Sequence, residues 1–198
     1  MPQLLQPAIS SRLRESSRVL AATAKLAPTL ARAAEILLAS YRRGGKVLTF
    51  GNGGSAADAQ HFAAELVGRF ERDRCALPAL ALTVNASDLT AIGNDFGFDD
   101  VFSRQLEAHA RPGDVVVAIT TSGNSRNVLK ATAVARRLKL ATIGLTGAGG
   151  GRLRASVDVC VRVPSKNIAR IQEAHGAIIH AWCAALEEGL FPGGARTR

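Results

Sequence analysis

Two short loops of small residues each follow an apolar run and precede a segment with helical periodicity. Residues 51–56 come after the apolar run 47–50, and residues 120–125 come after the run 115–119. A strand, a small-residue loop and a helix start direct backbone N–H groups and the positive helix end toward one point. Both loops also carry hydroxyl donors, at Ser55, Thr120, Thr121, Ser122 and Ser125. The sequence therefore predicts a site for an anion, such as the phosphate of a small molecule.

Two other interpretations of these loops compete with the anion site. Gly51, Gly53 and Ala56 fit the G-x-G-x-x-A dinucleotide motif, which also needs an acidic residue about 20 positions later at the end of a strand. Residues 68–73 instead end a helix and enter a polar loop, which disfavours a nicotinamide site. No G-x-x-x-x-G-K-[ST] motif supports nucleoside triphosphate hydrolysis. Glycines alone would suit tight turns, but that alternative leaves the hydroxyl groups unexplained.

Apolar runs and helical patterns alternate along the chain, which predicts an α/β fold with a mainly parallel sheet covered by helices on both faces. The 198 residues suit a single domain, residues 1–198. We expect N-terminal helices at about 4–43, a sheet-and-helix core at about 46–190 and a loose tail at 192–198. Pro28 starts the second helix, and Ser87 caps a short helix. Strands are expected at 46–50, 80–84, 115–119, 141–145 and 157–163, and the later helices at 56–69, 100–109, 126–138 and 168–190.

Composition narrows the class of protein further. The three cysteines are widely spaced, and no secretory signal or run of about 18 apolar residues is visible, so we expect a cytoplasmic protein without a membrane segment. The net charge of +9 raises the question of nucleic acid binding. However, the arginines are scattered and no DNA-binding motif is present, so a solvated surface together with attraction of anionic substrates explains the charge better.

Titratable residues gather on two predicted helices. His61 and Glu65 are four positions apart and therefore share a helix face, where they could ligate a metal or form an acid–base pair. A surface ion pair is the plainer explanation of such a pair taken alone. The last helix carries a second group, which comprises Gln172, Glu173, His175 and His180.

Four ordered motifs carry a family resemblance that extends over essentially the whole chain. They are FGNGGSAADAQHFAAEL at 50–66, AIGNDFGF at 91–98, TSGNS at 121–125 and RIQEAH at 170–175. The chain resembles the phosphoheptose isomerase family, which has the sugar-isomerase (SIS) fold. The resemblance implies a three-layer α/β structure with a mainly parallel central sheet, flanked by helices and preceded by N-terminal helices.

The resemblance also implies an activity, the interconversion of sedoheptulose 7-phosphate and glycero-manno-heptose 7-phosphate through an enediol. It implies that Glu65 is the base at carbon and that His180 handles the oxygen protons. It implies one zinc ion per subunit, held by His61, Glu65, Gln172 and His180. The positions that match substrate contacts are Asn52, Gly53, Gly54, Ser55, Glu65, Asn94, Asp95, Thr120, Thr121, Ser122, Ser125 and Gln172.

Geometry places one condition on the implied zinc site. Gln172 and His180 are eight positions apart, about 12 Å along a helix, whereas ligand bonds are about 2 Å. Both reach one ion only if both side chains stretch toward it; otherwise they serve different sites or different subunits. We expect a homotetramer with active sites at subunit contacts. Asn167 and Ile168 replace a frequent Asp-Thr pair of the family, so the sugar specificity is left open.

A binding protein is the alternative to an enzyme. The DnaA initiator-associating protein DiaA resembles this chain in Arg69-Phe70-Glu71, in residues 169–173 and in Leu190-Phe191-Pro192. DiaA lacks the catalytic glutamate and the last histidine, whereas this chain has Glu65 and His180. The sequence therefore favours the isomerase and keeps a DnaA-type partner only under the alternative.

Overall fold

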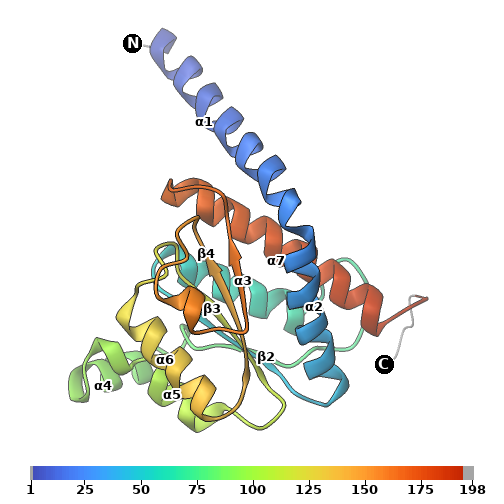
Figure 1. The fold of residues 1–198 in the computed structure, drawn as a ribbon, viewed down its shortest axis with the longest axis vertical. Helices are drawn as coiled ribbons and strands as arrows, with labels where there is room; N and C mark the ends of the chain where they lie inside the picture. The colour runs from blue at the N-terminus through green and yellow to red at the C-terminus, as the bar shows by residue number, and fades with distance from the viewer. Residues whose placement is uncertain (1, 194–198) are drawn as a thin grey trace.

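The computed structural model describes residues 2–193 and begins with two helices, joined by a 3₁₀ turn, that differ in their packing. Much of α1 projects away from the body, whereas α2 lies against it (Figure 1). Pro28 stands in the first turn of α2, where its fixed φ and missing N–H are harmless. Of the predicted tail, Pro192 and Gly193 form a turn, and residues 194–198 lie outside the described part. The bounds are α1 Pro2–Thr23, η1 Ala24–Leu26 and α2 Ala27–Arg42.

Five parallel strands form the central sheet, in the order β2-β1-β3-β4-β5. The two central strands β1 and β3 are buried along their whole length, as their continuous apolar sequences require. This arrangement confirms the predicted α/β class with a mainly parallel sheet. The bounds are β1 Val47–Gly51, β2 Ala79–Ala81, β3 Val115–Ile119, β4 Ala141–Thr146 and β5 Val159–Arg162.

Helices cover both faces of the sheet and complete a three-layer structure (Figure 1). One core cluster joins α2, α3 and α7 to alternate sheet residues such as Val115 and Val117. The other core cluster joins α5 and α6 to the sheet residues that point to the opposite face, such as Val116. None of the helices in residues 2–193 is long and apolar enough to cross a membrane. The remaining bounds are α3 Gly54–Val67, α4 Ala86–Asp95, η2 Phe98–Asp100, α5 Ser103–His109, α6 Arg126–Arg137, η3 Leu153–Ala155 and α7 Ile168–Leu190.

Two local predictions between β2 and α4 were wrong. The strand expected at 80–84 ends at Ala81, because β2 is an edge strand that pairs with β1 over three residues and then turns. Ser87 does not cap α4. The side chain of Asn85 accepts hydrogen bonds from the N–H groups of Ser87 and Asp88, so Asn85 is the N-cap.

Candidate functional site

The candidate site lies at the carboxyl edge of the sheet. The chain leaves β1 toward β2 on one side, whereas β3 lies on the other side of β1. Crevices form where the strand order reverses in this way, and ligands bind there in open α/β sheets. Both predicted anion loops start at this edge, one directly after β1 and one directly after β3.

Hydroxyl groups cluster in the loop between β3 and α6. The Oγ1 of Thr120 lies 3.0 Å from Oγ of Ser125 and 3.5 Å from Oγ of Ser122. Ser125 occupies the N-cap position of α6, but its side chain makes no capping hydrogen bond. The three hydroxyl groups therefore face one another at a helix N-terminus, where they and the helix dipole suit a phosphate.

The loop between β1 and α3 depends on two glycines. Gly53 has φ +56°, a conformation that other residues adopt only with strain. A Cβ atom on Gly54 would overlap the side-chain amide of Gln172, so α7 approaches the start of α3 closely. Asn52 exchanges two hydrogen bonds of 2.9 Å with the buried amide of Asn127, which ties the two anion loops together. Asn127 was not among the predicted site residues, because its only signal in the sequence is its place just after the second loop.

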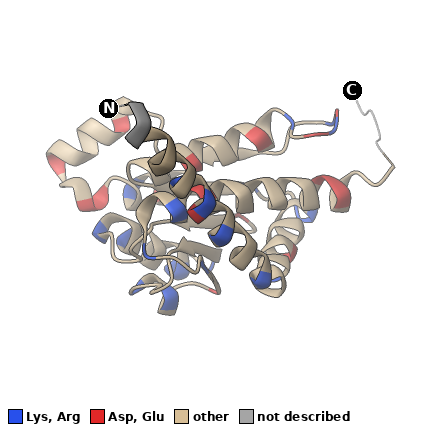
Figure 2. Cartoon of the chain, turned by 90° about the horizontal axis from the view of Figure 1, so that it is seen from above, with Lys and Arg blue, Asp and Glu red and all other residues tan. Residues whose placement is uncertain are grey.

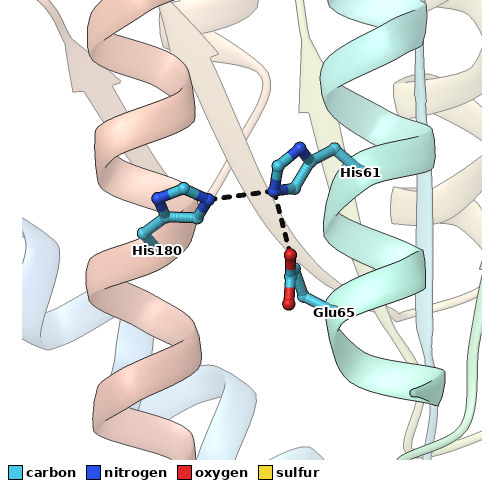
Figure 3. A group of neighbouring side chains, drawn as sticks. All are labelled: His61, Glu65 and His180. Atoms are coloured by element: carbon cyan, nitrogen blue, oxygen red, sulfur yellow. Dashed lines mark hydrogen bonds and ion pairs between the residues drawn. The ribbon is translucent and has the colours of Figure 1, made fainter. Parts of the chain in front are cut away.

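Three side chains meet farther along the same two helices. Nε2 of His61 lies 3.2 Å from Oε1 of Glu65 and 2.9 Å from Nε2 of His180 (Figure 3). His61 and Glu65 project from α3 and His180 from α7, which packs against it. The side chains of His61 and Glu65 are 47% and 25% exposed, so an incoming ligand can reach the cluster. A carboxylate and two imidazoles in contact can move protons or hold a metal ion.

Other predicted site residues lie apart from this cluster. Gln172 contacts Gly54 at the start of α3, seven positions before His61, which is about 10 Å along the helix. Asn94 and Asp95 are exposed at the end of α4, where the amide of Asn94 donates to Asp95 over 2.8 Å. Three of the four predicted zinc ligands therefore lie together within one chain, whereas Gln172 lies against the first anion loop.

A fully buried histidine, His175, and a partly buried aspartate, Asp58, lie on the same helices, one turn from the cluster. Burial lowers the pKa of His175 to about 4, although a hydrogen bond to the Thr146 carbonyl opposes the shift. Burial also raises the pKa of Asp58 to about 6, against the opposing effect of His61. Nδ1 of His175 and Oδ2 of Asp58 are 4.0 Å apart, and neither atom has a hydrogen-bond partner among the described residues.

The parallel sheet, the two anion loops and the helix pair define a class of protein, the SIS domain proteins. The SIS domain family model matches residues 13–147.

Within that class, two curated relatives named phosphoheptose isomerase are highly similar. The relative from Rhodospirillum rubrum is 57% identical over 164 residues, which span 83% of this chain and 87% of that protein. The relative from Geobacter sulfurreducens is 55% identical over 93% of this chain and 98% of its own length. The structure of the Neisseria gonorrhoeae phosphoheptose isomerase matches with a TM-score of 0.88 at 46% identity, over 93% of this chain and 99% of that one. The chain belongs to the phosphoheptose isomerase family.

Proposed function

We propose that this protein converts sedoheptulose 7-phosphate into D-glycero-D-manno-heptose 7-phosphate. The observation that carries the proposal is the contact of His61, Glu65 and His180 between the packed helices α3 and α7. Helix α3 starts at the anion loop that follows β1. An aldose–ketose isomerase needs an anchor for the phosphate and, at a distance, groups that move protons between C1 and C2. The hydroxyl-rich loop before α6 supplies the anchor, the pair of helices α3 and α7 supplies the proton carriers, and the names of the relatives agree with this reaction.

The chemistry follows from the residue types in the cluster. Glu65 takes the proton from the carbon next to the carbonyl and returns it to the neighbouring carbon, which passes the sugar through an enediol. His180 moves the proton between the two oxygens, because an imidazole can donate and accept near neutral pH. His61 lies against both groups and keeps them oriented toward one point.

The sugar phosphate is proposed to lie along the carboxyl edge of the sheet. The hydroxyl groups of Thr120, Ser122 and Ser125 hold the phosphate at the N-terminus of α6. A cavity of about 250 Å³ adjoins this loop and is lined in part by Thr121, Ser122 and Lys166. Asn52, Gly53, Gly54, Ser55, Asn94, Asp95 and Gln172 complete the proposed set of substrate contacts.

The cluster fits a zinc ion. One ligand atom from each of His61, Glu65 and His180 lies within 4.8 Å of the others. Two imidazole nitrogens and a carboxylate oxygen are donors that zinc accepts, at about 2 Å each. When bound, the ion would polarise the oxygens of the substrate. Gln172 was predicted as a fourth ligand, but from its place at Gly54 its side chain must move several Å along α7 to join. Metal analysis of the purified protein tests the proposal, which requires about one zinc per chain.

We also propose a homotetramer in the cytoplasm. Leu5, Ile9 and Leu13 recur every four residues on α1, so they share one face, and their exposed fractions are 64%, 59% and 67%. A projecting helix with an exposed apolar face buries it most simply against a second copy of the chain (Figure 1). Light scattering tests the assembly, and Ile9→Glu should shift the mass toward smaller species. Cys75, Cys160 and Cys183 are all free thiols, as a reducing compartment favours.

Nucleic acid is not proposed as a direct partner. Within residues 2–193, Lys and Arg are spread over several elements and do not form one continuous stripe (Figure 2). A DnaA-type protein partner belongs only to the binding-protein alternative, which the isomerase relatives do not favour.

Turnover on sedoheptulose 7-phosphate tests the proposed function directly. Glu65→Gln and His180→Gln should each lower kcat by about 10²-fold or more, because each removes one proton carrier. The exposed Glu188→Gln and His109→Gln are matched controls and should leave kcat unchanged. Zinc content is measured in each variant, since activity restored by added zinc would assign the residue to ligation. A folded, zinc-loaded wild type without turnover would overturn the assignment and favour the binding protein.

A further inference from the structure

A fully buried ion pair joins the loop after α3 to α7, near the proposed catalytic residues. Nε of Arg74 lies 2.8 Å from Oε1 of Glu187, and the side chains are 1% and 2% exposed. Burying two charges costs several kcal/mol for each ion, and good geometry with further hydrogen bonds is needed to offset it. Neither residue belongs to the predicted site, and the proposed reaction does not use them.

The Glu187 carboxylate organises the loop that follows α3. It accepts hydrogen bonds from the backbone N–H groups of Phe70, Glu71 and Arg72, at 2.9–3.0 Å. Burial raises the pKa of Glu187, but these three N–H groups and Arg74 together outweigh it and hold the pKa below its usual value. One side chain of α7 therefore fixes three consecutive peptide groups that belong to a distant part of the sequence.

The Arg74 guanidinium acts on the other helix. It donates to the carbonyl oxygen of Glu65 at 2.8 Å and to that of Leu66 at 3.0 Å. Carbonyl groups in the last turn of a helix lack partners within the helix, so Arg74 caps the end of α3. The same planar group thus holds the backbone of Glu65 and the carboxylate of Glu187 in a fixed geometry.

The loop also contacts the second proposed proton carrier. The ring of Phe70 lies 5.3 Å from the ring of His180, centroid to centroid. Because the N–H of Phe70 is held by Glu187, which lies two turns after His180 on α7, the loop packs against His180 from a fixed position. The network thus reaches the backbone of Glu65 on one side and the ring of His180 on the other.

We propose that Arg74 and Glu187 are positioning residues for the reaction, and that they set the relative placement of Glu65 and His180. The proposal rests on the proposed function, in which these two residues move the protons. A misplacement of about 1 Å at a reacting centre can cost about 10²-fold in rate. A role in stability alone would lower the folded fraction without changing the turnover of the folded molecules.

The test compares Glu187→Gln with a matched control, Asp114→Asn. Asp114 is also a buried carboxylate, and it binds the Lys46 ammonium and the N–H groups of Lys46 and Arg111. It precedes β3 at the amino edge of the sheet, away from the cluster. Both variants lose one buried charge, so both are expected to unfold at lower temperature. All kinetics are measured where at least 95% of each variant is folded.

Glu187→Gln should lower kcat at least tenfold with KM within about threefold of the wild type, whereas Asp114→Asn should change neither. The His180 ring signals, read by NMR of histidine-labelled protein, should shift in Glu187→Gln and stay in Asp114→Asn. Arg74→Lys is the second variant, since it keeps a cation but not the fork that reaches both Glu65 and Glu187. Arg74→Lys should also lower kcat, and it replaces Glu187→Gln in the test if Glu187→Gln does not fold.

Unchanged His180 signals and kcat in a folded variant at either position would overturn the proposal, as would equal losses of kcat in the Asp114 control. A wild type without turnover refutes the proposed function instead. In that case, the NMR comparison still decides whether the ion pair positions His180.

Discussion

The contact between buried His175 and partly buried Asp58 predicts how the stability of the protein depends on pH. His175 is fully buried, and burial lowers its pKa from 6.5 to about 4. The unfolded chain therefore binds a proton below pH 6.5 that the folded protein does not take up. Stability from this residue is full above pH 6.5 and is lost as the pH falls toward 4. A shift of about 2.5 units corresponds to about 3 kcal/mol.

The contribution of Asp58 to stability depends on pH in the opposite direction. Burial raises its pKa from 3.8 to about 6, so the folded protein keeps a proton that the unfolded chain releases. Its contribution is full below pH 3.8 and is lost as the pH rises toward 6, by at most about 3 kcal/mol, because water screens a carboxyl group that is only partly buried. Between pH 4 and 6 the two effects cancel, and the pair leaves the wild-type stability nearly independent of pH.

Substituting one of the two residues reveals the pH dependence of stability that the other contributes. Between pH 6.5 and 4.5, Asp58→Asn should lose about 2 kcal/mol of unfolding free energy relative to wild type, because His175 then acts alone. Between pH 6 and 4.5, His175→Gln should gain about 2 kcal/mol from Asp58 alone. Urea denaturation at a fixed protein concentration measures both, with exposed His109→Gln as the control. An Asp58→Asn profile that runs parallel to the wild-type profile would refute the reasoning.

Three further predictions concern binding and packing. Ser122→Ala and Ser125→Ala should each raise KM about 10-fold or more, since each removes a donor to a charged oxygen, and should lower kcat less; unchanged substrate affinity would remove the second loop as the phosphate site. Gly54→Ala should push the Gln172 side chain aside and weaken substrate binding with little loss of stability, and an unchanged KM would exclude Gln172 as a contact. Leu37→Ala, at a fully buried position, should cost about 2–5 kcal/mol in urea denaturation and leave kcat unchanged.

Most strand positions and the two small-residue loops that follow β1 and β3 could be predicted because their signals are local. The apolar run 47–50 and the small residues after it specify a buried strand and a tight turn within ten positions. The end of β2 depends on how far an edge strand finds a partner in β1, which no residue of that segment encodes. The N-cap falls at Asn85 and not at the predicted Ser87, because the backbone is extended at Asn85 and its side chain accepts the first free N–H groups of α4.

Contacts between distant segments could not be predicted. The i, i+4 spacing of His61 and Glu65 was visible, but their contact with His180 needed the relative position of two helices 119 residues apart. The helical rise indicated that Gln172 and His180 reach one ion only if their side chains stretch toward it, and in the structure the two side chains lie apart. In the sequence, Glu187 is one of two adjacent glutamates near a helix end, and only the folded loop at Phe70 shows what it binds.

The parallel sheet has a consequence for synthesis on the ribosome. The central ladder pairs Val47 with Val115 and Thr49 with Val117, residues 68 positions apart. A chain growing at about 5–20 residues per second therefore exposes the apolar β1 segment for about 3–14 seconds before its central partner exists. During that interval, the nascent chain offers an unpaired apolar strand, which is the kind of segment that chaperones cover and that aggregation recruits.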